Sequence, residues 1–243
     1  MADNSLRRRP IVPGDVRVIV TAYNEAERLQ ATLAGLALAF PGAPVWVGDD
    51  GSTDATPALA RAAGARVVRS ERVIGKGGAA TQAARDALKD ARDATAGPEL
   101  KSIFILCDGD LAESAAELGP LAAAIARGEA DLAVAAFATR MGGGVGLAVA
   151  FARWAIRRRC GLRTDAPISG QRALRADVLA EVLPFAAGYG MEMGMTIDAV
   201  RAGRRVIEIE LDLAHRATGR SAAGFAHRGR QLVEFLRVYL TRR

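Results

Sequence analysis

Short apolar runs alternate along this sequence with longer stretches whose apolar residues recur every three or four positions. Five such runs are predicted to be β-strands: residues 16–21, 45–48, 65–69, 103–107 and 131–137. Between the first two, Leu29, Leu33, Leu36 and Phe40 have helical spacing, and Asn24 is a candidate cap for the start of that helix. A further helix is expected over residues 114–127, before the last of the five strands. Strands that alternate with helices build βαβ units, in which the strands are parallel and helices cover the sheet. We therefore predict an α/β fold with a mostly parallel central sheet and helices on both faces.

The second half of the sequence is less regular. Helices are expected over residues 145–160, 176–183, 191–202 and 224–242, and strands over residues 170–175 and 205–211. We find no internal repeat and no linker long enough to separate two autonomous domains. Residues 1–15 are expected to form a disordered basic arm, and residues 16–243 a single domain.

Composition limits the kinds of partner. The formal net charge is +6 and the pI is near 10, which suits nucleic acid, an anionic membrane surface or phosphorylated substrates. Arginines without interleaved aromatic residues give no stacking platform for single strands, so we do not expect a nucleic-acid partner. Cys107 and Cys160 lack metal-ligand spacing and imply no disulfide framework.

The sequence also bears on where the protein acts. No apolar segment of the kind found in secretory signals is visible near the beginning. The longest apolar helix candidate, residues 145–156, contains Arg153 and is too short to span a bilayer. We expect a cytoplasmic protein, and leave peripheral contact with the inner face of the cell membrane open. An Ala-, Gly- and Arg-rich composition is typical of high-GC genomes, which favours a bacterial source.

Four polar motifs follow the predicted strands. Tyr23-Asn24-Glu25 comes after the first strand and Asp49-Asp50 after the second. Gly75-Lys76-Gly77 opens the helix after the third strand, and Asp108-Gly109-Asp110 follows the fourth. Ligands of open parallel sheets bind beyond the carboxyl ends of the strands. We therefore expect these four motifs to converge on one site.

Asp108-Gly109-Asp110 is an Asp-x-Asp motif that suits a divalent cation. Gly109 permits a tight turn, so that both carboxylates can face one point. Hard cations such as Mg²⁺ prefer oxygen ligands and often bridge to a diphosphate, and imidazole is a ligand for Mn²⁺-class metals. His215 is a candidate third ligand. The alternatives are a solvated turn for the carboxylates and a structural role for the histidine.

Two motifs are candidates for binding a nucleotide. Asp49 or Asp50 can accept a hydrogen bond from a base N–H, or else forms a strand-end turn. Gly75-Lys76-Gly77 offers backbone N–H groups and an ammonium group to a phosphate. It is not a Walker A loop, and the first strand lacks the glycine fingerprint of dinucleotide-binding folds.

Further candidates lie in the second half. Glu192, at a helix start, can accept a proton from an acceptor hydroxyl or position that hydroxyl, or it complements the helix dipole. Arg140, Arg216 and Arg220 can bind an acceptor phosphate or neutralise the leaving diphosphate, or are ordinary surface charge.

Taken together and in this order, the motifs closely resemble family 2 glycosyltransferases with the GT-A (Rossmann-like) fold. The resemblance is carried by residues 21–25, 49–54, 75–77 and 108–110 and covers residues 16–137, which we expect to form the nucleotide-sugar-binding half. Residues 138–243 would then form the acceptor-binding half. The resemblance implies a nucleotide-sugar donor held by Thr21, Ala22, Tyr23, Glu25, Asp49, Asp50, Gly75, Lys76, Asp108 and Gly109. It also implies Mg²⁺ or Mn²⁺ on Asp110.

Two groups within the family share features with this sequence. Ile168-Ser169-Gly170-Gln171-Arg172-Ala173 is similar to a segment of the polyprenyl-phosphate (dolichyl-phosphate mannose type) sugar transferases, which makes Ser169, Gly170 and Arg172 acceptor candidates. Residues 188–194 and His215 resemble the glucosyl-3-phosphoglycerate synthases.

The sequence thus predicts a metal-dependent transferase. It would move a hexose from a donor of the UDP-glucose or GDP-mannose class to a phosphorylated or polyprenyl-phosphate acceptor, in cell-envelope or phosphoglycerate-type glycoside synthesis. Catalytic roles are expected for Asp110, Glu192 and Lys76. The alternatives are a non-catalytic nucleotide- or polyanion-binding protein on the same scaffold, and a sugar-phosphate nucleotidyltransferase. A homodimer is left open.

Overall fold

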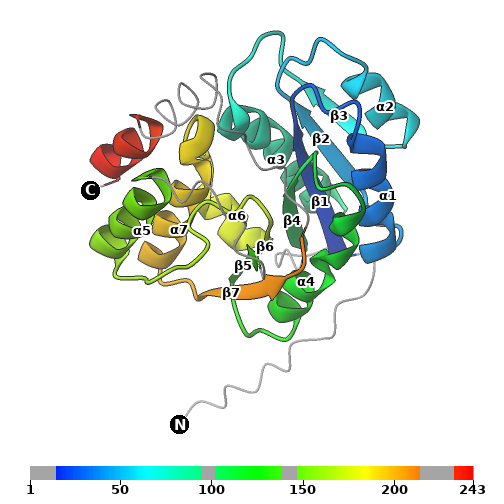
Figure 1. Ribbon diagram of the computed structural model, residues 1–243. Helices are drawn as coiled ribbons and strands as arrows, with labels where there is room; N and C mark the ends of the chain where they lie inside the picture. Colours follow the sequence, from blue (N-terminus) through cyan, green and yellow to red (C-terminus); the bar gives the residue numbers. More distant parts are fainter. Residues whose placement is uncertain (1–14, 95–101, 138–146, 214–232, 243) are drawn as a thin grey trace.

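In the part of the chain that the structure describes, seven strands form a single sheet in the order β3-β2-β1-β4-β6-β5-β7 (Figure 1). The computed structural model describes residues 15–94, 102–137, 147–213 and 233–242. The strands are β1 (Val16–Ala22), β2 (Val45–Asp49), β3 (Arg66–Arg69), β4 (Ile103–Asp108), β5 (Leu132–Phe137), β6 (Arg172–Arg175) and β7 (Val206–Leu211). β6 is antiparallel to both β4 and β5, and the other neighbours are parallel. The predicted mostly parallel sheet is therefore confirmed.

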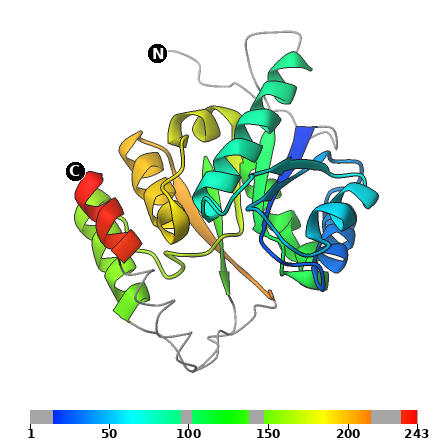
Figure 2. The same cartoon turned by 90° about the horizontal axis from the view of Figure 1, so that it is seen from above.

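Helices pack on both faces of the sheet, as predicted. They are α1 (Leu29–Ala39), α2 (Thr56–Ala62), α3 (Lys76–Asp93), α4 (Gly119–Ala126), α5 (Leu147–Cys160), α6 (Ala176–Val182) and α7 (Met191–Arg201), with the 3₁₀ segments η2 (Ala112–Leu118) and η3 (Gly188–Gly190). A further helix covers residues 233–241. Figure 2 shows the sheet edge-on between these helical layers.

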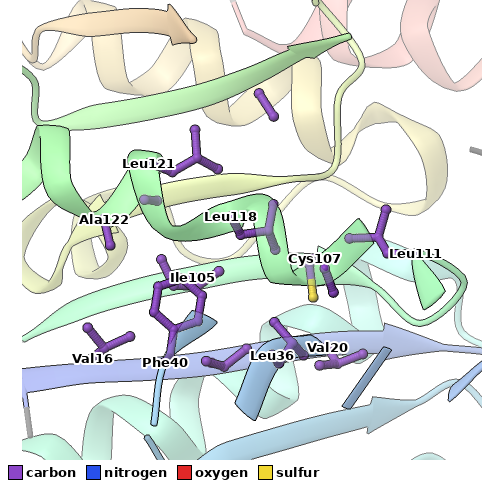
Figure 3. Close-up of a cluster of buried hydrophobic side chains, with 14 of the residues drawn as sticks. Val16, Val20, Leu36, Phe40, Ile105, Cys107, Leu111, Leu118, Leu121 and Ala122 are labelled. Atoms are coloured by element: carbon purple, nitrogen blue, oxygen red, sulfur yellow. The ribbon is translucent and has the colours of Figure 1, made fainter. Parts of the chain in front are cut away.

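One core lies between the sheet and the helices α1, η2 and α4. Leu36 and Phe40 pack there against strand residues such as Val20 and Ile105, and Leu118 closes the cluster from η2 (Figure 3). Side chains alternate across a strand, so the intervening strand residues point to the opposite face. The apolar positions predicted for the first helix are thus confirmed as core positions.

The opposite core contains α3, α6 and α7. The buried face of α3 consists mainly of alanines, which let its backbone approach the sheet closely. A Cβ on Gly48 of β2 would lie 2.8 Å from the carbonyl oxygen of Ala79. A third cluster joins α5, α7 and helix 233–241 through small and aromatic side chains, including Ala152 and Phe235.

Two local predictions need correction. The helix expected from residue 114 to residue 127 is a 3₁₀ segment followed by α4, which has Pro120 in its first turn. Proline lacks an amide hydrogen and clashes inside a helix, but it fits a helix start. Asn24 does not begin the first helix, which starts at Leu29. The φ angle of Asn24 is 54°, and the side-chain oxygen of Asn24 accepts a hydrogen bond from the Thr53 N–H at 2.8 Å.

The arm predicted over residues 1–15 lies, apart from its last residue, outside the described residues. Of the helices that the structure describes, none has the length and apolar content required to cross a membrane.

Candidate active site

The ladders of the sheet bring three of the predicted motifs to one edge. Ala22 of β1 lies opposite Asp49 of β2, and Thr21 lies opposite Asp108 of β4. Beyond the strands, the Gly109 N–H donates to the Thr21 carbonyl at 2.9 Å. The carboxyl ends of β1, β2 and β4 therefore meet, and α3 begins beside them at Lys76 (Figure 1).

Lys76 is the cation at the centre of this edge. Its Nζ lies 2.6 Å from Asp108 Oδ1 and 2.6 Å from Glu192 Oε1. The three side chains come from the start of α3, the end of β4 and the first turn of α7. Burial alone would lower the pKa of Lys76, but the two carboxylates outweigh that effect and raise it. Lys76 is therefore a fixed positive charge shared by two carboxylates.

Asp108 is fully engaged by protein groups. Besides Lys76, its Oδ1 accepts a hydrogen bond from the Thr21 hydroxyl at 3.1 Å. Its Oδ2 accepts one from Gln171 Nε2 at 3.0 Å. Gln171 was not among the predicted site residues, although it lies inside a segment that the sequence singled out. A Cβ on the preceding residue, Gly170, would lie 2.6 Å from both Asp108 Oδ2 and Lys76 Nζ, so a side chain at this position would displace the ion pair.

The carboxylate of Asp110 differs from that of Asp108 in its hydrogen bonding. Its Oδ1 is buried and has no hydrogen-bond partner among the described residues. The loop that carries it is held by Thr32 of α1, whose hydroxyl donates to the Gly109 carbonyl at 2.9 Å and accepts from the Ala112 N–H at 2.8 Å. Sequence reasoning missed Thr32; the available signal was a polar residue on the apolar face of a helix, between Leu29 and Leu33.

The orphaned oxygen of Asp110 fits a divalent cation. A buried carboxylate oxygen without a partner is costly unless something binds it. The described part of the chain holds no cluster of three or more His, Cys, Asp and Glu residues suited to a metal. Mg²⁺, however, is commonly bound by one or two carboxylates together with substrate phosphates. Asp110 is thus a suitable ligand, whereas Asp108 is engaged by Lys76; the predicted ligand His215 lies outside the described residues.

The two carboxylates predicted to bind the base both hold loops. Asp50 accepts hydrogen bonds from the backbone N–H groups of residues 74–75 at 2.7 and 3.0 Å. Asp49 is 0% exposed, accepts from the Ser52 N–H at 3.2 Å and lies 3.3 Å from Arg69 Nε. The prediction that Asp49 contacts the donor directly is therefore not supported, because no part of its carboxylate reaches the surface. Asp50 fixes Gly75, and through it the position of Lys76.

The other donor candidates lie around the end of β1. Ala22 is buried, and the hydroxyl of Thr21 is turned toward Asp108. Tyr23 is 46% exposed. The Glu25 backbone N–H donates to the Thr56 hydroxyl at 2.8 Å. Of these side chains, the Tyr23 ring is the one that offers a large exposed surface.

The acceptor candidates divide into buried and undescribed residues. Arg172 is 0% exposed and donates hydrogen bonds to the Ser169 carbonyl at 2.8 Å and the Thr196 hydroxyl at 2.9 Å. Burial lowers its pKa to about 10 despite the nearby charge of Glu192. Arg172 therefore has no exposed surface with which to touch an acceptor, whereas for Ser169, which is 5% exposed, that role stays a prediction. The other acceptor candidates, Arg140, Arg216 and Arg220, lie outside the described residues.

One further residue reaches the site from the last helix. Glu234 Oε2 accepts a hydrogen bond from the Tyr189 N–H at 2.6 Å, just before α7. A Cβ on Gly188 would overlap the Glu234 carboxylate, and a Cβ on Gly75 would lie 3.3 Å from the Gly188 Cα. Glu234 is therefore linked through η3 to the loop that carries Lys76. No sequence motif indicated this contact, because it joins segments far apart in the chain.

Comparisons with known proteins show which proteins the chain is similar to. The family model for glycosyl transferase family 2 matches residues 17–180. An undecaprenyl-phosphate mannosyltransferase of Micrococcus luteus is 31% identical over 222 residues, which cover 85% of this chain and 86% of the relative.

Solved structures of glucosyl-3-phosphoglycerate synthase from Mycobacterium tuberculosis are also similar. Its complex with phosphoglyceric acid is 26% identical, with a TM-score of 0.71 over 94% of this chain and 80% of that one. Its complex with Mn²⁺, UDP and glucosyl-3-phosphoglycerate has a TM-score of 0.70, 26% identity and the same coverage.

Proposed function

The chain belongs to glycosyl transferase family 2, and from this premise we propose that it transfers a hexose from a nucleotide sugar to a phosphate-bearing acceptor. The observation that carries the proposal is the edge where Lys76 is held between Asp108 and Glu192, next to the unpartnered buried oxygen of Asp110. A fixed ammonium group and a free carboxylate oxygen are the groups that a metal-bound diphosphate requires. Residues 16–137 form the donor half and residues 138–243 the acceptor half in this proposal.

The donor belongs to the UDP-glucose or GDP-mannose class, and its diphosphate lies beside Lys76 and Asp110. When bound, Mg²⁺ or Mn²⁺ supplies positive charge that stabilises the departing nucleoside diphosphate. Lys76 adds a second positive charge, already oriented by its two carboxylates. Asp110 is the ligand for the ion, and the Tyr23 ring is the exposed surface against which a base can lie.

The acceptor is a polyprenyl phosphate. Glu192, the carboxylate expected to act as a base, is 3% exposed and ion-paired with Lys76, so it is poorly placed to collect a proton from a hydroxyl. A phosphate monoester carries about −1.5 to −2 charge near neutral pH and needs no base to become nucleophilic. The M. luteus relative supports this choice. The second candidate is a phosphoglycerate hydroxyl, which the M. tuberculosis structures favour.

The donor is tested by thermal unfolding of the purified protein with UDP, GDP and their sugars, with and without Mn²⁺. A ligand that binds only the native state stabilises it by about 2.7 kcal/mol at a hundredfold excess over Kd. We expect a metal-dependent rise in Tm for one nucleotide, and its loss in Asp110→Asn. The control is Asp93→Asn, an exposed carboxylate at the far end of α3. A shift that survives in Asp110→Asn would contradict the placement of the metal.

The acceptor is tested by incubating labelled donor with undecaprenyl phosphate in detergent or with 3-phosphoglycerate. The dephosphorylated alcohol and glycerate serve as matched controls, because they lack only the phosphate. We expect label on undecaprenyl phosphate and on neither control. Label on 3-phosphoglycerate alone would establish the second candidate, and no transfer to any phosphate-bearing acceptor would overturn the proposal.

A further inference from the structure

Among the described residues, two neighbouring helices carry most of the large apolar side chains that are exposed. Of seven such side chains among the described residues, four lie on α5 and helix 233–241: Trp154, Val233, Leu236 and Leu240, each 45–53% exposed. On helix 233–241 the three are spaced by three and four residues, so they form one stripe. Phe235 and Val238 of the same helix face the core. The helix is thus apolar on both its inner and its outer side.

The two helices present one continuous surface. Figures 1 and 2 both show helix 233–241 lying along α5. The Trp154 and Tyr239 rings are 4.9 Å apart between centroids, and Phe151 lies 5.5 Å from Trp154. The Arg159 guanidinium stacks 3.9 Å from the Tyr239 ring centre. The aromatic cluster therefore joins the exposed residue of α5 to the stripe.

This surface is strongly basic. α5 and residues 233–242 contain six arginines and one glutamate, and the glutamate is Glu234, which bonds to the Tyr189 N–H. Arg157, Arg158 and Arg237 are exposed. Trp154, Val233, Leu236, Leu240 and these three arginines are called here the apolar-basic surface.

We propose that the apolar-basic surface binds the anionic face of a lipid bilayer. Tryptophan and tyrosine favour the boundary between headgroups and acyl chains, where an apolar stripe can insert and cations meet anionic headgroups. In an isologous interface between two copies of the chain, the arginines of one copy would face those of the other, and like charges brought together repel. The charge of the surface therefore favours lipid over a second copy of the chain.

The surface is tied to the active site by two contacts. Glu234 bonds to the Tyr189 N–H beside the loop of Lys76. Arg242 forms an ion pair with Asp198 of α7, in which its Nε lies 2.7 and 2.8 Å from the two carboxylate oxygens, and α7 carries Glu192. A bilayer bound at this surface would hold the site at a fixed orientation to the membrane, where a polyprenyl phosphate resides. The inference rests on the proposed function only for that reason; the binding itself does not depend on it.

Tryptophan fluorescence gives a direct test, because the chain has two tryptophans in different settings. Trp46 is 0% exposed and donates a hydrogen bond to Asp86 at 2.9 Å, so it cannot reach lipid. We expect vesicles of phosphatidylcholine with about one third phosphatidylglycerol to shift the emission of Trp154 to the blue. Lipids brominated on their acyl chains should quench it. An unchanged spectrum in the presence of such vesicles would overturn the proposal.

Variants then locate the surface by vesicle co-sedimentation. Leu236→Asp with Leu240→Asp is expected to weaken binding at least about tenfold, and Arg157→Gln with Arg158→Gln to weaken binding to anionic vesicles by about tenfold. The matched control is Leu38→Asp, on α1, which is 76% exposed and should bind as the wild type does.

The vesicles contain no acceptor and no donor, so failure of binding and failure of the transfer reaction are separate results. A nucleotide-induced rise in Tm that is equal in all variants shows that each is folded. Equal loss of binding in Leu38→Asp would overturn the proposal. If the wild type is a dimer that does not bind vesicles, and the Leu236→Asp, Leu240→Asp variant is a monomer, the proposal is overturned: the apolar-basic surface then binds a second copy of the chain and not a bilayer.

Discussion

Lys76 neutralises two carboxylates that would otherwise repel each other in a poorly hydrated place. The side chains of Asp108 and Glu192 are 21% and 5% exposed. Breaking a buried ion pair by removing one partner commonly costs several kcal/mol, because a charge is left without compensation. The same residue that is proposed to meet the donor therefore also stabilises the fold.

We expect Lys76→Met to lower the free energy of unfolding by about 3 kcal/mol and to abolish transfer. Chemical denaturation measures the first effect and a labelled-donor assay the second. Adding Glu192→Gln to Lys76→Met should recover part of the stability, because one unpaired charge is removed, while transfer stays absent. Additive losses in the double variant would show that the two side chains are not coupled.

Thr32 acts on the site through the loop that carries Asp110. We expect Thr32→Val, which keeps the shape but removes both hydrogen bonds, to cost about 1–3 kcal/mol of stability. It should also weaken the metal-dependent rise in Tm caused by the nucleotide, because Asp110 is no longer held. Thr32→Ser keeps the hydroxyl and should preserve that rise. If Thr32→Val lowers Tm but leaves the nucleotide response unchanged, Thr32 has only a structural role.

At the scale of elements, the first turn of α3 lies against the segment before η3. A Cβ on Gly77 would overlap the carbonyl oxygen of Ala186. Backbone cannot yield as a flexible side chain can, so α3 and this segment would have to separate.

We expect Gly77→Ala to destabilise the protein by about 1–3 kcal/mol and to lower transfer, because Lys76 shifts with the helix start. Gly119→Ala is the control: it also lies in the first turn of a helix, and a Cβ there meets nothing within 4 Å. Urea unfolding of the two variants checks this difference. Equal stabilities would show that the close approach at Gly77 is easily relieved.

The sequence predicts the elements better than it predicts the pairing of polar side chains. Apolar periodicity located the strands and α1, because it reports which face is buried, and strand ends then placed Lys76 and Asp108 at one edge. It could not show that Asp49 is buried or that Asp50 binds the loop at residues 74–75. Those contacts depend on loop paths, which periodicity does not encode. The strand expected over residues 170–175 is present as β6, but its antiparallel direction was not predicted, because four residues carry no information on strand direction.

At the scale of the whole molecule, a network of charges ties α6 to the sheet. Asp177 accepts hydrogen bonds from Arg175 at 2.9 Å and from Arg204 at 3.1 Å. Burial alone would raise the pKa of Asp177, but these two arginines outweigh that effect and hold it below the ordinary value of 3.8. A carboxyl group whose folded pKa is depressed stabilises the fold above its unfolded pKa, and that stabilisation is lost as the pH falls.

We therefore expect the stability difference between wild type and Asp177→Asn to be constant near neutral pH and to shrink below about pH 4. The urea midpoint measured between about pH 7 and pH 3 checks this prediction. A stability difference that stays the same across the whole pH range would show that the charge of Asp177 does not stabilise the fold.

The contact between Glu234 and Tyr189 also has a consequence for the timing of biosynthesis. A ribosome makes the chain from its N-terminus, so Lys76, Asp108 and Glu192 are all made before Glu234. A nascent chain that has not yet reached residue 234 contains the groups proposed to bind the donor, but not the carboxylate that holds the turn beside them. The residues of the site are therefore synthesised in two stages. Glu234, which holds the turn at Tyr189, is made together with the apolar stripe of helix 233–241 that is proposed to bind lipid.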